Sequence, residues 1–153
     1  MTKMIISMLL LLSLNLSAGF TVVNSGIIEY YKSASEYYTK ACENGNMSRC
    51  VDLGILYFTG SGVQENHKKA EELFAIACKN KHSKACYHLG TMYKRGSNGI
   101  KKNLKKSKML YALGCMHGYA QSCDQYNLIK EKAETKGSDA DANRYRYYTD
   151  NIW

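Results

Sequence analysis

Apolar positions in the middle of the chain recur at the 3.6-residue spacing of amphipathic helices. One stripe, at i, i+3, i+4, i+7 and i+8, consists of Ala70, Leu73, Phe74, Ala77 and Cys78. The preceding stripe consists of Cys50, Leu53, Gly54 and Tyr57. The pattern predicts helices over residues 25–44, 47–59, 67–80, 83–95, 104–117 and 120–134. The sequence has no proline and no alternating strand pattern, so we expect an all-α protein.

The helical pattern repeats along the chain. The segments KACENGNMSRCVDLGILYFTGSGVQENHKKA and IACKNKHSKACYHLGTMYKRGSNGIKKNLKKS align, and their cysteines recur after 36 and then 37 residues. Leu53-Gly54 matches Leu89-Gly90, and Tyr57 matches Tyr93. A period in the thirties indicates stacked helical hairpins. We therefore expect a right-handed αα-solenoid of about three repeats over residues 25–134.

Two glycines interrupt the expected helices. A glycine inside a helix costs about 1 kcal/mol relative to alanine. Because each stripe continues past its glycine, we expect Gly54 and Gly90 to let a neighbouring helix approach closely rather than to end a helix.

The N-terminal residues have the pattern of a signal peptide. Lys3 precedes the apolar run 4–16, and small residues follow at 17–19, which predicts a secretory signal over residues 1–18. The alternative is a membrane anchor, but a span needs roughly 20 apolar residues and this run is shorter. We expect the chain to be secreted or periplasmic, with no membrane span.

All six cysteines fall into three pairs with the same spacing of eight residues. The pairs are Cys42 with Cys50, Cys78 with Cys86, and Cys115 with Cys123. In an oxidising compartment an even number of cysteines indicates disulfides, and one local pairing satisfies all three repeats. Each bond would fix the turn between consecutive hairpins.

A zinc site is the alternative role for the cysteines. Structural zinc usually takes cysteines two to four residues apart, which these pairs do not provide. The histidines complete no ligand spacing, so we expect no metal or other cofactor and place them at the surface or at edges. They are His67, His82, His88 and His117.

The pattern AC-x7-C-x2-LG-x2-Y-x2-G resembles the Sel-1-like repeat, a relative of the tetratricopeptide repeat. The resemblance covers roughly residues 33–128, and the paired cysteines resemble those of the secreted Helicobacter cysteine-rich proteins. At the end, Tyr126-Asn127 replaces Leu-Gly and Lys130 replaces the tyrosine. We expect residues 120–134 to form a polar capping helix, followed by a C-terminal tail over 135–153.

The resemblance implies a module that binds proteins or peptides, with peptidoglycan fragments as one ligand class. The cysteine-rich subfamily has also been classed as penicillin-binding proteins or β-lactamases. A serine β-lactamase would need S-x-x-K, S-D-N and K-T-G elements, and none of these occurs in the sequence. We name no catalytic residue, and β-lactam hydrolysis stays the alternative function.

Charge is distributed unevenly. The whole chain has a formal net charge of +8, and residues 73–123 contain ten lysines and arginines but no acid. The densest part is Lys94–Lys108. A solvated basic face is one explanation. Nucleic acid is the usual partner of a basic patch, but export disfavours it. An anionic partner outside the cytoplasm fits better: an acidic protein, lipopolysaccharide or a cell-wall peptide.

In related arrays the inner helix of each hairpin lines the concave surface. The resemblance therefore suggests a partner-binding stripe of Val51, Ile55 and Phe58 in one repeat and Tyr87, Thr91, Lys94 and Arg95 in the next. The first three residues are equally compatible with ordinary core packing. We expect a monomer.

Overall fold

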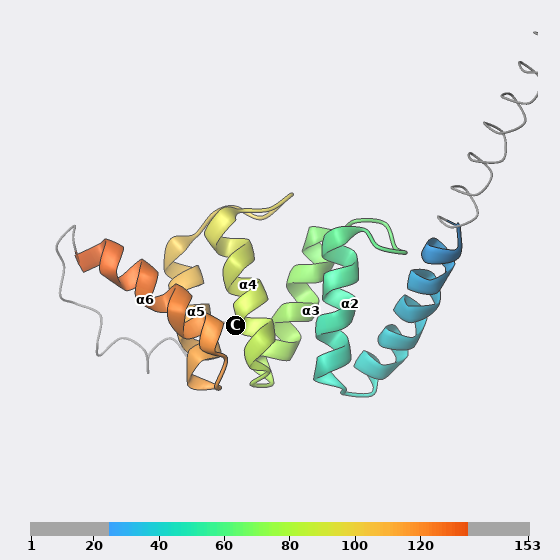
Figure 1. Cartoon of the computed structure of the whole chain (residues 1–153), viewed down its shortest axis with the longest axis horizontal. Coiled ribbons are helices and arrows are strands. Elements are labelled where there is room, and N and C mark those ends of the chain that lie inside the picture. The colour runs from blue at the N-terminus through green and yellow to red at the C-terminus, as the bar shows by residue number, and fades with distance from the viewer. Residues whose placement is uncertain (1–24, 135–153) are drawn as a thin grey trace, which may run out of the picture.

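The computed structural model describes residues 25–134, and these residues form a solenoid of helices (Figure 1). A helical segment over residues 25–43 comes first. It is followed by α2 (Met47–Thr59), α3 (His67–Lys79), α4 (Ser83–Arg95), α5 (Leu104–Met116) and α6 (Ala120–Glu134). The expected signal sequence 1–18 and tail 135–153 lie outside the described residues.

The helices begin and end within one residue of the predicted bounds. Asparagine side chains explain three of the starts: Asn46, Asn66 and Asn103 each accept a hydrogen bond from the backbone N–H three residues on. An asparagine at this position satisfies one of the backbone donors that a helix N-terminus leaves unpaired. The loops before α3 and α5 are also equivalent, because the Asn66 and Asn103 N–H groups donate to Tyr57 O and Tyr93 O at 2.8 Å.

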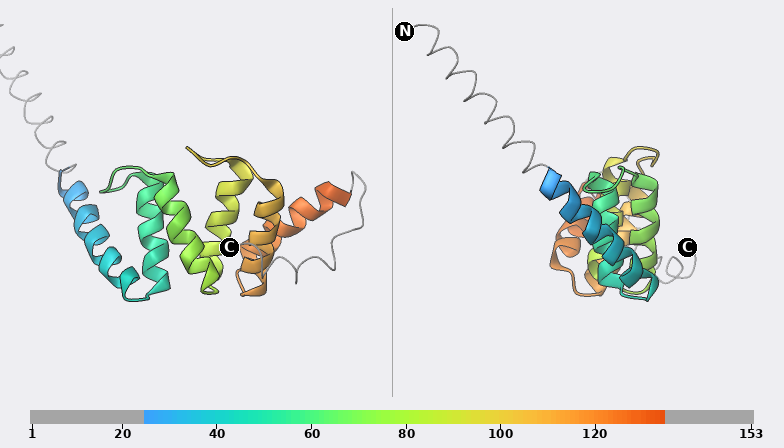
Figure 2. Two further views of the ribbon diagram at one scale, coloured as in Figure 1. Left: turned by 180° about the vertical axis from the view of Figure 1, so that it is seen from behind. Right: turned by 90° about the vertical axis from the view of Figure 1, so that its right-hand side faces the viewer.

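Consecutive helices pack against one another in a row, which confirms the αα-solenoid (Figure 1). Turned by 90°, the same helices stack behind one another (Figure 2). The pairs α2–α3 and α4–α5 form the two complete hairpins, and α6 packs against α5. Within residues 25–134 no helix combines the length and the apolar character that a membrane crossing requires.

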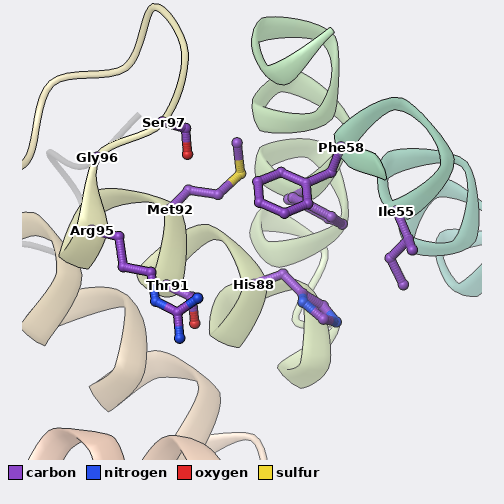
Figure 3. Close-up of a pocket in the computed structure, with 9 residues that line it drawn as sticks. Ile55, Phe58, His88, Thr91, Met92, Arg95, Gly96 and Ser97 are labelled. Carbon is purple, nitrogen blue, oxygen red and sulfur yellow. The ribbon is translucent and has the colours of Figure 1, made fainter. Parts of the chain in front are cut away.

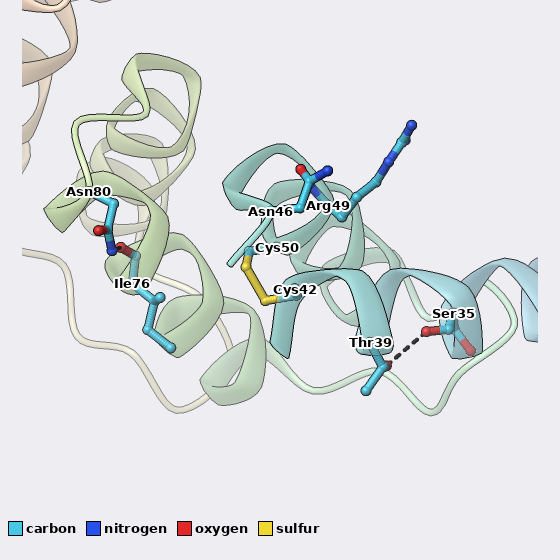
Figure 4. The surroundings of a disulfide bond; sticks show 8 residues. All are labelled: Ser35, Thr39, Cys42, Asn46, Arg49, Cys50, Ile76 and Asn80. Atoms are coloured by element: carbon cyan, nitrogen blue, oxygen red, sulfur yellow. Dashed lines mark hydrogen bonds between the residues drawn. A yellow bond between two sulfur atoms is a disulfide. The ribbon is translucent and has the colours of Figure 1, made fainter. Parts of the chain in front are cut away.

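Disulfides close the turns between consecutive hairpins, with the predicted pairing. The Cys42–Cys50, Cys78–Cys86 and Cys115–Cys123 bonds have Cα–Cα distances of 4.7, 4.7 and 4.6 Å. Figure 4 shows the first of them, joining segment 25–43 to the first turn of α2. These three bonds use all six cysteines of the sequence, each of which lies within the described residues.

Both interior glycines lie where another helix approaches. A Cβ on Gly54 would lie 2.7 Å from a ring carbon of Phe74, and one on Gly90 would lie 3.0 Å from the ring of Tyr111. Phe74 and Tyr111 are among the most deeply buried side chains of the described residues. The close approach predicted from the sequence is confirmed, and in each hairpin it places a large aromatic ring from the second helix over the first.

Candidate interaction site

A hollow of about 230 Å³ lies between α2, α3 and α4, at the level where α4 ends (Figure 3). Its lining residues are Ile55, Phe58, Phe74, His88, Thr91, Met92, Arg95, Gly96 and Ser97. Pockets for drug-sized ligands measure roughly 300–1,000 Å³. The hollow is smaller than that range, and its size suits a single side chain better than a whole small molecule.

The walls of the hollow are mostly apolar. Ile55 and Phe58, one turn apart on α2, form one side, and the buried Phe74 of α3 and Met92 of α4 lie behind them. Phe58 is 39% exposed. Its ring stacks on His67 at a centroid distance of 4.6 Å. The wall therefore presents apolar surface to solvent while His67 holds the Phe58 ring in place.

His88 contributes an uncharged ring to the hollow. It stacks on Phe74 at a centroid distance of 5.2 Å. Burial, together with the nearby charges of Lys84 and His82, lowers the pKa of His88 to about 4. The ring is therefore neutral at pH 7. His88 is half-buried and lines the hollow, in agreement with the expected edge position, while its Nε2 atom is buried without a hydrogen-bond partner among the described residues.

One cation stands at the rim. Arg95 is exposed at the end of α4 and lines the hollow. Thr91, one turn earlier, is already engaged, since its hydroxyl donates to Tyr87 O at 2.9 Å and shares a 3.0 Å hydrogen bond with the Tyr111 hydroxyl. The guanidinium of Arg95 is thus the charged group that a ligand in the hollow would meet.

The loop after α4 carries two further cations. Ser97 and Ile100 pair through two backbone hydrogen bonds of 3.0 and 2.8 Å, and Ile100 is buried. This tight turn brings the chain back beside the hollow: a Cβ on Gly96 would lie 3.4 Å from the backbone nitrogen of Lys102. Lys101 and Lys102 are exposed.

Four residues of the predicted partner-binding stripe line the hollow: Ile55, Phe58, Thr91 and Arg95. The other three do not. Val51 is 1% exposed and belongs to the core, in agreement with the alternative of ordinary packing. Tyr87 packs edge-on to Tyr119, at a centroid distance of 5.2 Å. Lys94 donates to the Gln125 side chain on α6 at 2.6 Å.

The equivalent positions at the next junction, between α4, α5 and α6, have different chemistry. One repeat further along, Thr91 takes the place of Ile55, Lys94 that of Phe58 and Gln125 that of His88. Hydrogen bonds join Lys94 to Gln125 and Thr91 to Tyr111. The polar side chains at this second junction are thus paired, whereas the first junction has an apolar-lined hollow.

Three segments of the chain, residues 31–46, 50–82 and 83–119, match the family model for the Sel1 repeat. Together they cover more than half of the sequence. The chain belongs to the Sel1 repeat family.

A solved structure agrees with this assignment. The crystal structure of a Sel1 repeat protein from Oxalobacter formigenes is similar over 76% of this chain and 47% of its own, with 27% sequence identity and a TM-score of 0.63. The chain thus spans about half the length of that protein. A protective antigen of uropathogenic Escherichia coli strains, with an SLR fold, is similar over 67% of this chain and 30% of its own, with 17% identity and a TM-score of 0.35. No curated protein sequence matches the chain.

The two complete Sel1 repeats coincide with the hairpins α2–α3 and α4–α5, so the hollow lies where one repeat meets the next. Sequence reasoning missed five of its lining residues: Phe74, His88, Met92, Gly96 and Ser97. Phe74 is part of the apolar stripe of α3, which marks it as a core residue. The sequence does not indicate that one edge of the ring of such a core residue faces a hollow.

Part of the basic run makes contacts within the repeats. Lys106 donates to the Tyr93 hydroxyl at 2.8 Å, and its Nζ lies 4.3 Å from the centre of that ring. The Tyr93 hydroxyl in turn donates to Glu71, and burial and this hydrogen bond raise the pKa of Tyr93. Lys106 and Lys94 therefore support the packing of neighbouring helices. Arg95 is exposed and lines the hollow, and Lys101 and Lys102 are exposed in the loop that follows α4.

Within the described residues, no group of three or more histidine, cysteine, aspartate or glutamate side chains is placed to hold a metal ion. The site offers instead an apolar hollow, a neutral imidazole and the exposed guanidinium of Arg95. Such a surface can bind and orient a partner through burial and charge.

Proposed function

We propose that this Sel1 repeat protein is an exported interaction module that holds an anionic protein or peptide on its middle repeats. Sel1 repeats mediate protein–protein interaction. The observation that carries the proposal is the apolar hollow with the exposed Arg95 among its lining residues. Arg95 lies, with the exposed Lys101 and Lys102, in a stretch of 51 residues without an acid.

Export is part of the proposal. The three disulfides are of the kind that forms and persists in oxidising compartments, and the apolar run 4–16 supports a cleaved signal over residues 1–18. The doubled cysteine motif supports membership of the secreted Helicobacter cysteine-rich subfamily. A cell-wall peptide, with its free carboxylates, is a partner class compatible with this location.

Salt dependence and charge reversal test the proposal. A partner captured by the mature protein from the medium or the periplasm should bind more weakly as salt rises, because salt screens exposed charges. Replacing both Arg95 and Lys102 with glutamate should also weaken binding, whereas Lys79→Glu, an exposed change at the other end of α3, should have little effect. Binding indifferent to both salt and reversal would show that the basic run is only a solvated face.

Penicillin binding or β-lactam hydrolysis is the alternative that the subfamily suggests, and a nitrocefin assay separates it from our proposal. The protein should come from a host without β-lactamases, with a reduced sample as the unfolded control. We expect no sustained turnover. Turnover that disappears on reduction would establish a hydrolase and contradict the proposal.

A further inference from the structure

We propose that the hollow between α2, α3 and α4 is an anchor pocket for one aliphatic or aromatic side chain of the partner, and that Arg95 pairs with a carboxylate next to this anchor. The inference rests on the proposed function and adds the chemistry that the site selects.

Size and lining define the anchor. A volume of about 230 Å³ accommodates one side chain of the partner. The apolar walls of Ile55, Phe58 and Met92 favour a hydrophobic group, since burial stabilises by roughly 25 cal/mol per Å² of apolar surface. The neutral ring of His88 adds a flat surface without adding charge. The same wall would not suit a charged or strongly hydrated side chain.

The charge of Arg95 determines which group of the partner lies next to the anchor side chain. Arg95 is a lining residue as well as an exposed one, and Figure 3 shows its side chain on the α4 side of the hollow, across from Phe58 and Ile55. A partner group in the hollow therefore has a guanidinium beside it. Arginine is suited to carboxylates because its planar fork can donate two parallel hydrogen bonds.

The second junction, between α4, α5 and α6, lacks the apolar side chains that would hold a second anchor. Its equivalents of Ile55 and Phe58 are the hydrogen-bonded Thr91 and Lys94. An apolar side chain entering there would have to break these hydrogen bonds without replacing them, and an unpaired buried polar group is costly. Of these two junctions, the geometry thus assigns the anchor, and with it the register of the partner, to the first.

Blocked amino acids test this chemistry without a known partner. The probes are N-acetyl-L-phenylalanine, which has both the ring and a carboxylate, its neutral amide, and N-acetyl-L-alanine, which has the carboxylate without the anchor. Binding is followed by titration with methyl NMR of Ile55 and Met92. We expect the acid to bind roughly two- to fivefold more tightly than the amide, the ratio given by an exposed ion pair, and the alanine derivative to give no saturation.

Two substitutions separate the anchor from the charge. Arg95→Gln should abolish the difference between acid and amide while both still bind, whereas Lys79→Gln, at an exposed position on α3, should preserve it. Ser97→Leu fills the hollow from its edge without removing the backbone pairing with Ile100, and should weaken both phenylalanine probes at least tenfold. Circular dichroism confirms that each variant is folded.

Three outcomes would overturn the inference. They are equal binding of acid and amide to the wild-type protein, unchanged binding by Ser97→Leu, and shifts that leave Ile55 and Met92 unaffected. Absence of any probe binding would also overturn it. None of these would contradict the proposed function, which is tested separately by the salt and charge-reversal dependence of the captured partner.

Discussion

Removing the central disulfide should lower the stability of the solenoid by an amount that chain entropy predicts. Cys78 and Cys86 close a ring with a sequence separation of eight, for which the loop-entropy model gives about 2–3 kcal/mol. Both cysteines are buried, at 4% and 0% exposure. Replacing both with alanine therefore also removes packed sulfur atoms, but no large side chain, and we expect the lost cross-link to dominate.

Chemical denaturation followed by far-UV circular dichroism measures this loss. The double variant Cys78→Ala/Cys86→Ala should unfold at a lower denaturant concentration, with a free energy of unfolding reduced by about 2–4 kcal/mol. That is a large fraction of the 5–15 kcal/mol typical of a domain. A matched variant removes Cys115 and Cys123, which close a ring of the same size and are less buried. It should lose nearly as much, because the entropy of loop closure is the same.

An unchanged unfolding curve for the central variant would refute the argument that the bond constrains the junction between repeats. Full reduction of the wild-type protein should have a larger effect than either double variant, because it removes three such constraints. A melt that is the same with and without reductant would contradict the role we assign to all three bonds.

Three further predictions concern single residues. Gly54→Ala should destabilise by roughly 1–2 kcal/mol in chemical denaturation, because overpacking against Phe74 outweighs the helix propensity gained; equal or higher stability would contradict the close approach. Lys81 has φ 64° where the equivalent turns have Gly45 and Gly118. Lys81→Gly should therefore raise the free energy of unfolding by about 0.5–1 kcal/mol, and with it the melting temperature. A lower melting temperature would refute this. The pKa of His88 is about 4 in the folded protein, below its usual 6.5. As pH drops from about 6.5 to 4, the unfolded chain is therefore protonated at this residue before the folded protein is. The free energy of unfolding should fall by on the order of 2–3 kcal/mol over this range. His88→Gln should remove that part of the pH dependence, and an identical pH profile would show that His88 does not cause it.

The helices and disulfides could be predicted from the sequence because their signals are local and repeated. An apolar stripe that recurs after 36 or 37 residues predicts the same helical hairpin in each repeat. The equal spacing of each cysteine pair, such as Cys42 and Cys50, leaves one pairing that satisfies every repeat. The interior glycines correctly predicted a close approach between helices. A glycine such as Gly54 lowers the stability of its own helix, so its presence indicates that the missing side chain makes room for a neighbouring helix.

The hollow could be predicted only in part. A stripe beside the core identified Ile55 and Phe58, but whether such residues face solvent, core or a hollow depends on how neighbouring helices are spaced. Val51, on the same stripe, is buried in the core. The low pKa of His88 was not predictable either, because it depends on burial beside Phe74 from another helix.

The most direct test of the interaction site is to map where a captured partner contacts the protein. Methyl-labelled isoleucine and methionine spectra of the mature protein would be recorded with and without that partner. Our account predicts that the Ile55 and Met92 signals shift, while those of Ile27 and Ile28, exposed on the N-terminal helical segment, stay in place. Shifts confined to Ile27 and Ile28, with Ile55 and Met92 unchanged, would contradict the assignment of the partner to the junction between the two complete repeats.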